Sequence, residues 1–156
     1  MTIDSSTAAA SDRTLVIDRI FNAPPQLVFS VWTRAEHLAR WFGPEDFTLP
    51  YCEIDFRVGG SYRFCMRSPE GEEHSVWGEY REIVTGERIV MTWNREHPDG
   101  EIWSTTIVEL SFREAGSKTA FRLHQSLFET VPYRDEHGFG WGQALDRLNR
   151  LLEDLN

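Results

Sequence analysis

The sequence is poor in cysteine and has no long apolar run. Its only two cysteines, Cys52 and Cys65, are too few for a disulfide framework or a zinc site. No apolar run approaches the roughly 18 residues that a membrane-spanning helix needs. Residues 1–12 lack the basic and apolar regions of a secretory signal. We therefore expect a cytoplasmic protein without a membrane span.

Basic residues are also scarce. The chain of 156 residues has 16 Lys and Arg against 25 Asp and Glu, which gives a formal net charge of -9. This charge repels polyphosphate, and the basic residues form no stripe, so nucleic acid is not expected as a partner. The composition does not specify an oligomeric state.

The two cysteines fall on consecutive predicted strands. A four-residue turn over Arg57–Gly60 would place Cys52 opposite Cys65. Because cytosolic thiols stay reduced, we expect two free thiols rather than a disulfide.

Motifs for metals, nucleotides and nucleophilic catalysis are missing as well. The clusters Asp135-Glu136-His137 and Glu72-Glu73-His74 lack the i, i+4 histidine spacing of a helical metal site, and we expect them to be solvated charges. The segment Gly138–Gly142 is rich in glycine, but it does not follow a strand as a phosphate-binding loop does. We expect no metal and no cofactor.

The chain does have enough apolar residues for one core. It is 40% hydrophobic and 13% aromatic, and a domain of this length can be stable without metals or disulfides. We expect a disordered tail over residues 1–12, which are mostly small and polar, and one domain over residues 13–156.

Local patterns predict the elements. Leu15–Phe21 reads as a strand, and Pro24-Pro25 starts a helix. Thr33-Arg34-Ala35-Glu36 fits a capping box for a second short helix, which Trp41-Phe42-Gly43-Pro44 ends. From Tyr51 to Leu127 the period is two and turn signals recur, including His97-Pro98-Asp99-Gly100, so we expect six further strands in meander order.

The alternation also predicts which side chains face inward. Tyr62, Phe64 and Met66 alternate with polar residues, as in a sheet with one buried face. The same phase makes the following residues inward on later strands: Val76, Gly78, Tyr80, Ile89, Met91, Trp93, Val108, Leu110, Phe112, Phe121, Leu123 and Gln125. A buried Gln125 must form hydrogen bonds, either with the fold or with a ligand.

The end of the chain returns to a helical period. Trp141, Leu145, Leu148, Leu152 and Leu155 share one stripe of a long helix. Glycines at 138, 140 and 142 disfavour a helix there. Either the helix approaches another element or a ligand closely, or it begins only near residue 140.

These elements predict an α+β fold: a curved antiparallel sheet of about seven strands around a long C-terminal helix, with two short helices after the first strand. The space between the sheet and the long helix is then the expected pocket. Trp41 and Trp141 are candidate gate residues at its mouth.

Several segments together resemble a known family. They are Arg19–Pro24, Val28-Phe29, Trp32-Thr33, Trp41–Pro44, Arg57–Gly60, Gly78-Glu79-Tyr80, Ile89–Trp93 and Gly140-Trp141. In order and spacing they are similar to the START/Bet v-like, helix-grip SRPBCC superfamily, and within it to the family of homologues of the activator of the heat-shock-protein-90 ATPase.

The resemblance implies the helix-grip fold and, as in many relatives, a cavity for a hydrophobic or aromatic small molecule. We expect such a ligand to contact the following residues: Trp41, Phe64, Met66, Tyr80, Met91, Trp93, Gln125, Trp141 and Leu145. Two other functions stay open: an enzyme, similar to polyketide cyclases, that acts on an apolar substrate in the same cavity, and a module that binds a chaperone. The founding co-chaperone has an additional amino-terminal domain for which these 156 residues leave no room, so chaperone activation is not expected.

Overall fold

The computed structural model describes residues 12–95 and 105–156. Its elements are β1 (Leu15–Phe21), α1 (Pro25–Ser30), α2 (Ala35–Trp41), β2 (Thr48–Ile54), β3 (Ser61–Arg67), β4 (Glu73–Val84), β5 (Arg88–Arg95), β6 (Thr106–Ala115), β7 (Lys118–Ser126) and α3 (Val131–Leu155). The predicted turn over residues 97–100 and all but the last residue of the predicted tail lie outside the described residues.

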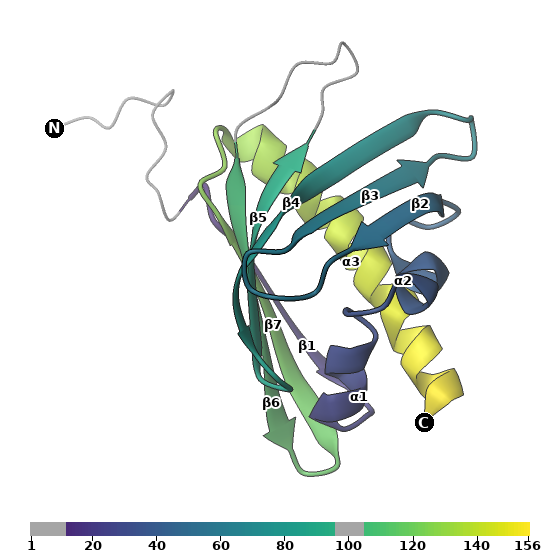
Figure 1. The fold of residues 1–156 in the computed structure, drawn as a ribbon, viewed down its shortest axis with the longest axis vertical. Helices are drawn as coiled ribbons and strands as arrows, with labels where there is room; N and C mark the ends of the chain where they lie inside the picture. The colour runs from purple at the N-terminus through teal and green to yellow at the C-terminus, as the bar shows by residue number, and fades with distance from the viewer. Residues whose placement is uncertain (1–11, 96–104) are drawn as a thin grey trace, which may run out of the picture.

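The strands form one antiparallel sheet in the order β1-β7-β6-β5-β4-β3-β2. The sheet curves, and α3 runs across its inner face on the same side as α1 and α2 (Figure 1). α1 contacts β6 and β7, whereas α2 contacts β2 and α3. The α+β helix-grip fold expected from the sequence is therefore confirmed, including the seven strands and the two short helices after the first strand.

The predicted inward faces are mostly buried. Tyr62, Phe64, Tyr80 and Trp93 are each less than 5% exposed. Gly78 is needed where the backbone of β4 lies close against its neighbour β5, because a Cβ there would lie 2.1 Å from the carbonyl oxygen of Thr92. The same oxygen accepts a hydrogen bond from the Tyr62 hydroxyl. Alternation along the strands therefore predicted the core face correctly.

The expected register of the cysteines is wrong by one residue. Cys65 pairs with Tyr51, and Cys52 pairs with Phe64. Since successive side chains of a strand point to opposite faces, the two thiols lie on opposite faces of the sheet. Cys65 contacts the Ser75 hydroxyl at 3.0 Å. Both thiols are free, as expected.

The start of α2 differs from the expected capping box. Its N-cap is Arg34, without a side-chain cap hydrogen bond. The Thr33 hydroxyl instead donates to the carbonyl of Ser30 at the end of α1. The predicted cap is therefore wrong by one residue, and the Thr33 hydroxyl bonds back to α1 rather than to the first turn of α2.

Helix α3 begins at Val131, nine residues before Gly140. The alternative that the helix begins only near residue 140 is therefore wrong. Thr130 caps it, and its hydroxyl accepts from the backbone N–H of Tyr133. Close approach explains one glycine: a Cβ at Gly138 would lie 3.2 Å from Cδ1 of Leu15. The predicted stripe is wrong at Leu155, which is 38% exposed and does not belong to the buried core.

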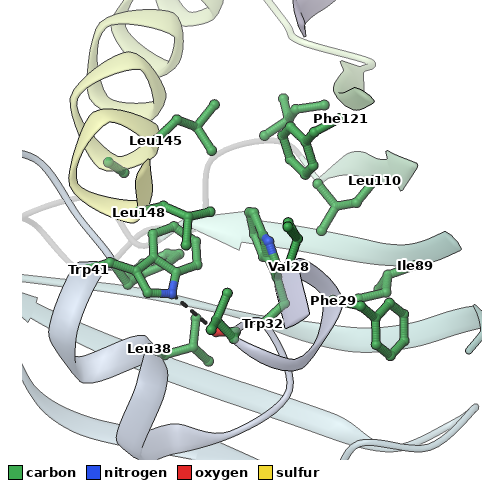
Figure 2. Close-up of a cluster of buried hydrophobic side chains, with 14 of the residues drawn as sticks. Val28, Phe29, Trp32, Leu38, Trp41, Ile89, Leu110, Phe121, Leu145 and Leu148 are labelled. Atoms are coloured by element: carbon green, nitrogen blue, oxygen red, sulfur yellow. Dashed lines mark hydrogen bonds between the residues drawn. The ribbon is translucent and has the colours of Figure 1, made fainter. Parts of the chain in front are cut away.

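The core lies between the sheet and the helices (Figure 2). Leu145 and Leu148 of α3 point toward Trp41 and Phe121 there. The Trp32 ring stacks on Phe121, with 5.6 Å between centroids. Aromatic rings therefore fill the interior beside the C-terminal half of α3.

Candidate functional site

A cleft of about 330 Å³ opens between α3, the segment after α2 and strands β3 to β5. This volume is at the lower end of the range for small-molecule sites, roughly 300–1,000 Å³. Its apolar wall consists of Phe42, Phe47, Met66, Val76, Trp93, Phe139, Trp141 and Ala144. Its polar groups are Glu45, His74, Arg95, Glu136, His137 and Gln143. The cleft is mainly aromatic, with charges at its border.

The inward side chains of strand β5 belong partly to the core and partly to the wall of the cleft. Its inward row continues from Ile89 and Met91 to Trp93 and Arg95, and the last two line the cleft. Trp93 is 4% exposed, and its Nε1 has no hydrogen-bond partner among the described residues. Arg95 pairs with Glu136 of α3, with 2.6 Å between Nη1 and Oε1. This strand therefore supplies an aromatic surface and one paired cation.

Trp141 of α3 is held in place from the sheet. Its Nε1 donates to Oε1 of Gln125, at 2.9 Å, and Nε2 of Gln125 donates to the Thr106 hydroxyl. The ring lies 5.2 Å from Trp93 and 5.8 Å from Phe42, between centroids. The fold thus satisfies Gln125, which was the first of the two alternatives that the sequence left open.

The segment after α2 is tied to α3. Arg147, half-buried, donates from one guanidinium nitrogen to the carbonyls of Phe42, Gly43 and Pro44 at 2.9–3.3 Å. Gln143 accepts from the backbone N–H of Glu45. Burial lowers the pKa of Arg147, but three carbonyl dipoles face its charge. This edge of the cleft is therefore built by α3 and the loop together.

His137 forms part of the wall on α3 and is 8% exposed. Its Nδ1 lies 3.1 Å from the carbonyl oxygen of Tyr133, which requires Nδ1 to be the donor. Burial lowers the pKa of His137 to about 4. The imidazole is therefore neutral at pH 7, and the expectation of a solvated cluster at 135–137 is wrong for this histidine.

The interior beyond the cleft is almost filled. A void of about 10 Å³ lies among Trp32, Leu38, Phe42, Phe64, Tyr80, Ile89, Met91 and Leu110. Phe42 borders both this void and the cleft. Between α3 and strands β3 to β5, the cleft is thus open at one end of the sheet, and the packed rings beyond it leave only this small void.

The structure divides the nine expected ligand residues into three groups. Met66, Trp93 and Trp141 line the cleft. Phe64, Tyr80 and Met91 border the small void. Trp41, Gln125 and Leu145 line neither. Trp41 is fully buried and donates to the carbonyl of Val31, as the dashed line in Figure 2 shows.

Sequence reasoning missed several residues of the cleft. Arg95 has the inward phase of Trp93, two residues earlier, and this signal could have identified it. His137 falls four residues before Trp141 on the same helical face. Phe47 lies outside the helices and strands, so no periodicity marks it.

In the described part of the chain, no helix is long and apolar enough to cross a membrane. Within the same residues, no three His, Cys, Asp or Glu side chains gather as metal ligands would.

A curved antiparallel sheet against a long C-terminal helix, with an aromatic cleft at one end, defines the helix-grip, START-like class of domain. Solved structures share this fold. The AHSA1 protein of Silicibacter pomeroyi superimposes with a TM-score of 0.84 at 22% identity, covering 92% of this chain and 99% of that one. A protein of Nitrosomonas europaea gives 0.78 at 24%, covering 96% and 100%. One of Chromobacterium violaceum gives 0.76 at 28%, covering 90% and 97%.

The family follows from the sequence model that the chain matches. The model described as activator of Hsp90 ATPase homolog 1-like protein covers residues 22–153. The chain belongs to this family, as its resemblance indicated. No curated protein matches the chain.

Proposed function

We propose that this protein binds an apolar, aromatic small molecule in the cleft between α3 and strands β3 to β5. The observation that carries the proposal is the aromatic cleft itself, where Trp93, Trp141 and Phe42 leave about 330 Å³ open. Aromatic rings favour offset or edge-to-face contacts with a flat ligand. The family and the START-like fold support a binding role but specify no ligand.

Catalysis is less well supported by the polar wall. Arg95 and Glu136 neutralise each other. His137 uses Nδ1 for the carbonyl of Tyr133, and its pKa of about 4 makes it a weak base at neutral pH. We therefore propose binding rather than a cyclase-like reaction.

The third alternative is a chaperone-binding module, which the family description suggests. Of the large apolar side chains that are exposed in the described residues, Phe139 alone borders the cleft, and it is 70% exposed. A single exposed ring is ordinary for a soluble domain and does not form an interaction patch. The cleft is therefore the better basis for a function.

The test is titration with naphthalene derivatives, followed by the fluorescence of the tryptophans. Met66→Trp adds bulk to the wall of the cleft, and we expect it to weaken binding at least about tenfold. Val84→Trp is the matched control, because Val84 is 40% exposed and does not line the cleft. Absence of binding by the wild-type protein, or equal binding by the Met66 variant, would refute the proposal.

A further inference from the structure

Two buried indole N–H groups lack a hydrogen-bond partner in the described part of the chain: those of Trp32 and Trp93. Indole nitrogen is only a donor, and a buried donor without an acceptor is destabilising. The neighbouring rings show how the fold usually solves this problem. Trp41 donates to a carbonyl and Trp141 donates to Gln125.

The two unpaired donors differ in their surroundings. Trp32 borders the void of about 10 Å³, which has no room for a ligand. Trp93 lines the cleft of about 330 Å³. A molecule in the cleft therefore comes to rest beside Trp93 and not beside Trp32.

The other polar groups near Trp93 already have partners. Arg95 pairs with Glu136, and Gln143 accepts from the backbone of Glu45. This leaves the indole of Trp93 as the unsatisfied buried donor among the described residues that line the cleft.

The charges around the cleft indicate what kind of acceptor fits. Arg95 is the one arginine or lysine among the described lining residues, and two carboxylates, Glu45 and Glu136, border the same cleft. His137 is neutral at pH 7. Both carboxylates have ion-pair partners, Glu136 in Arg95 and Glu45 in Arg150. The described lining therefore offers an anionic ligand no unpaired cation, and an uncharged acceptor fits better.

We infer that the ligand of the cleft carries a neutral carbonyl group, as in a ketone, quinone, ester or amide, and that this oxygen accepts a hydrogen bond from Nε1 of Trp93. The inference rests on the proposed binding function and adds the polar group that the ligand bears. In the free protein the nitrogen is covered by its neighbours, so the acceptor reaches it when side chains at the edge of the cleft shift on binding.

The test compares two probes of nearly the same shape, methyl naphthyl ketone and isopropenylnaphthalene, in which a methylene group replaces the carbonyl oxygen. The measured quantity is the ratio of the alkene's Kd to the ketone's Kd. One neutral hydrogen bond corresponds to a factor of about two to ten in this ratio. We expect Trp93→Phe to lower the ratio by that factor. Trp32→Phe, the matched control, should leave the ratio unchanged, because it removes the other unpaired indole.

Each outcome decides between the two proposals. If both probes bind the wild-type protein but the ratio is the same in Trp93→Phe, the carbonyl inference is wrong and the binding function stands. If neither probe binds, both fail. Naphthoate should bind more weakly than the ketone, and tighter binding of naphthoate would overturn the neutral acceptor.

A second measurement does not need the variant to fold. In proton–nitrogen correlation spectra of the wild-type protein, the indole signal of Trp93 should shift more with the ketone than with the alkene. Equal shifts with both probes would overturn the inference.

Discussion

At the scale of single residues, His137 links the cleft to the stability of the fold. Its pKa is about 4 in the folded protein because burial disfavours the charged form, whereas an ordinary histidine has a pKa near 6.5. The unfolded chain therefore binds the proton more readily. Stability from the neutral imidazole is complete above about pH 6.5 and is lost as the pH falls toward 4.

The expected result is a loss of up to about 3 kcal/mol in the free energy of unfolding between pH 7 and pH 4 through this group. Urea unfolding at several pH values measures it. His137→Gln keeps a donor for the Tyr133 carbonyl but does not titrate, so its stability should fall less over the same window. The charged neighbours Arg95 and Glu136 are present in both proteins. Parallel pH curves would show that His137 does not carry the effect.

At the scale of elements, the contact between α3 and the segment after α2 shapes the cleft. Arg147→Met removes the donor for three carbonyls. Hydrogen bonds to a charged group contribute roughly 1.5–3 kcal/mol, so we expect a loss of stability of that order and faster amide exchange at Phe47. Hydrogen exchange with mass spectrometry measures the second effect.

The matched control is Arg150→Met. Arg150 forms an exposed ion pair with Glu45, and solvent screens such pairs so that they contribute little to stability. The loop should stay protected in this variant. If both variants loosen the loop equally, the carbonyl contacts of Arg147 are not what holds this edge of the cleft.

At the scale of the whole molecule, stability depends on the stripe of α3 that packs on the sheet. Leu148 is fully buried, whereas Leu155 is 38% exposed. Leu148→Ala should cost about 2–5 kcal/mol in the free energy of unfolding, because it leaves a cavity. Leu155→Ala should change it by less than about 0.5 kcal/mol, as a surface substitution does. Thermal or urea unfolding compares the two, and a Leu148 variant as stable as its parent would contradict the packing.

Much of this fold was predictable because strand and helix patterns are local. Alternation identified Tyr62, Phe64 and Trp93 as inward residues, and the helical period identified Trp141 and Leu148 as buried. These patterns follow from the directions of side chains along one element, which neighbouring residues alone determine. The resemblance to the family covered the same elements, and the match of the family model to residues 22–153 confirms that resemblance.

The shape of the site was not predictable in this way. Whether Trp41 lines a cavity depends on Val31 and α3, and whether Gln125 is free depends on Trp141, sixteen residues later. The one-residue error at Cys52 has the same origin, since register is decided by pairing between strands.

The sequence by itself determined the elements, the buried face of the sheet and the family. Only the tertiary structure decided that aromatic rings fill most of the interior, that the open space is a cleft at one end, and that Trp93 has an unpaired donor there. The physical reason is that empty space and unpaired groups are properties of side chains from distant elements meeting in three dimensions, and no local pattern records which of them meet.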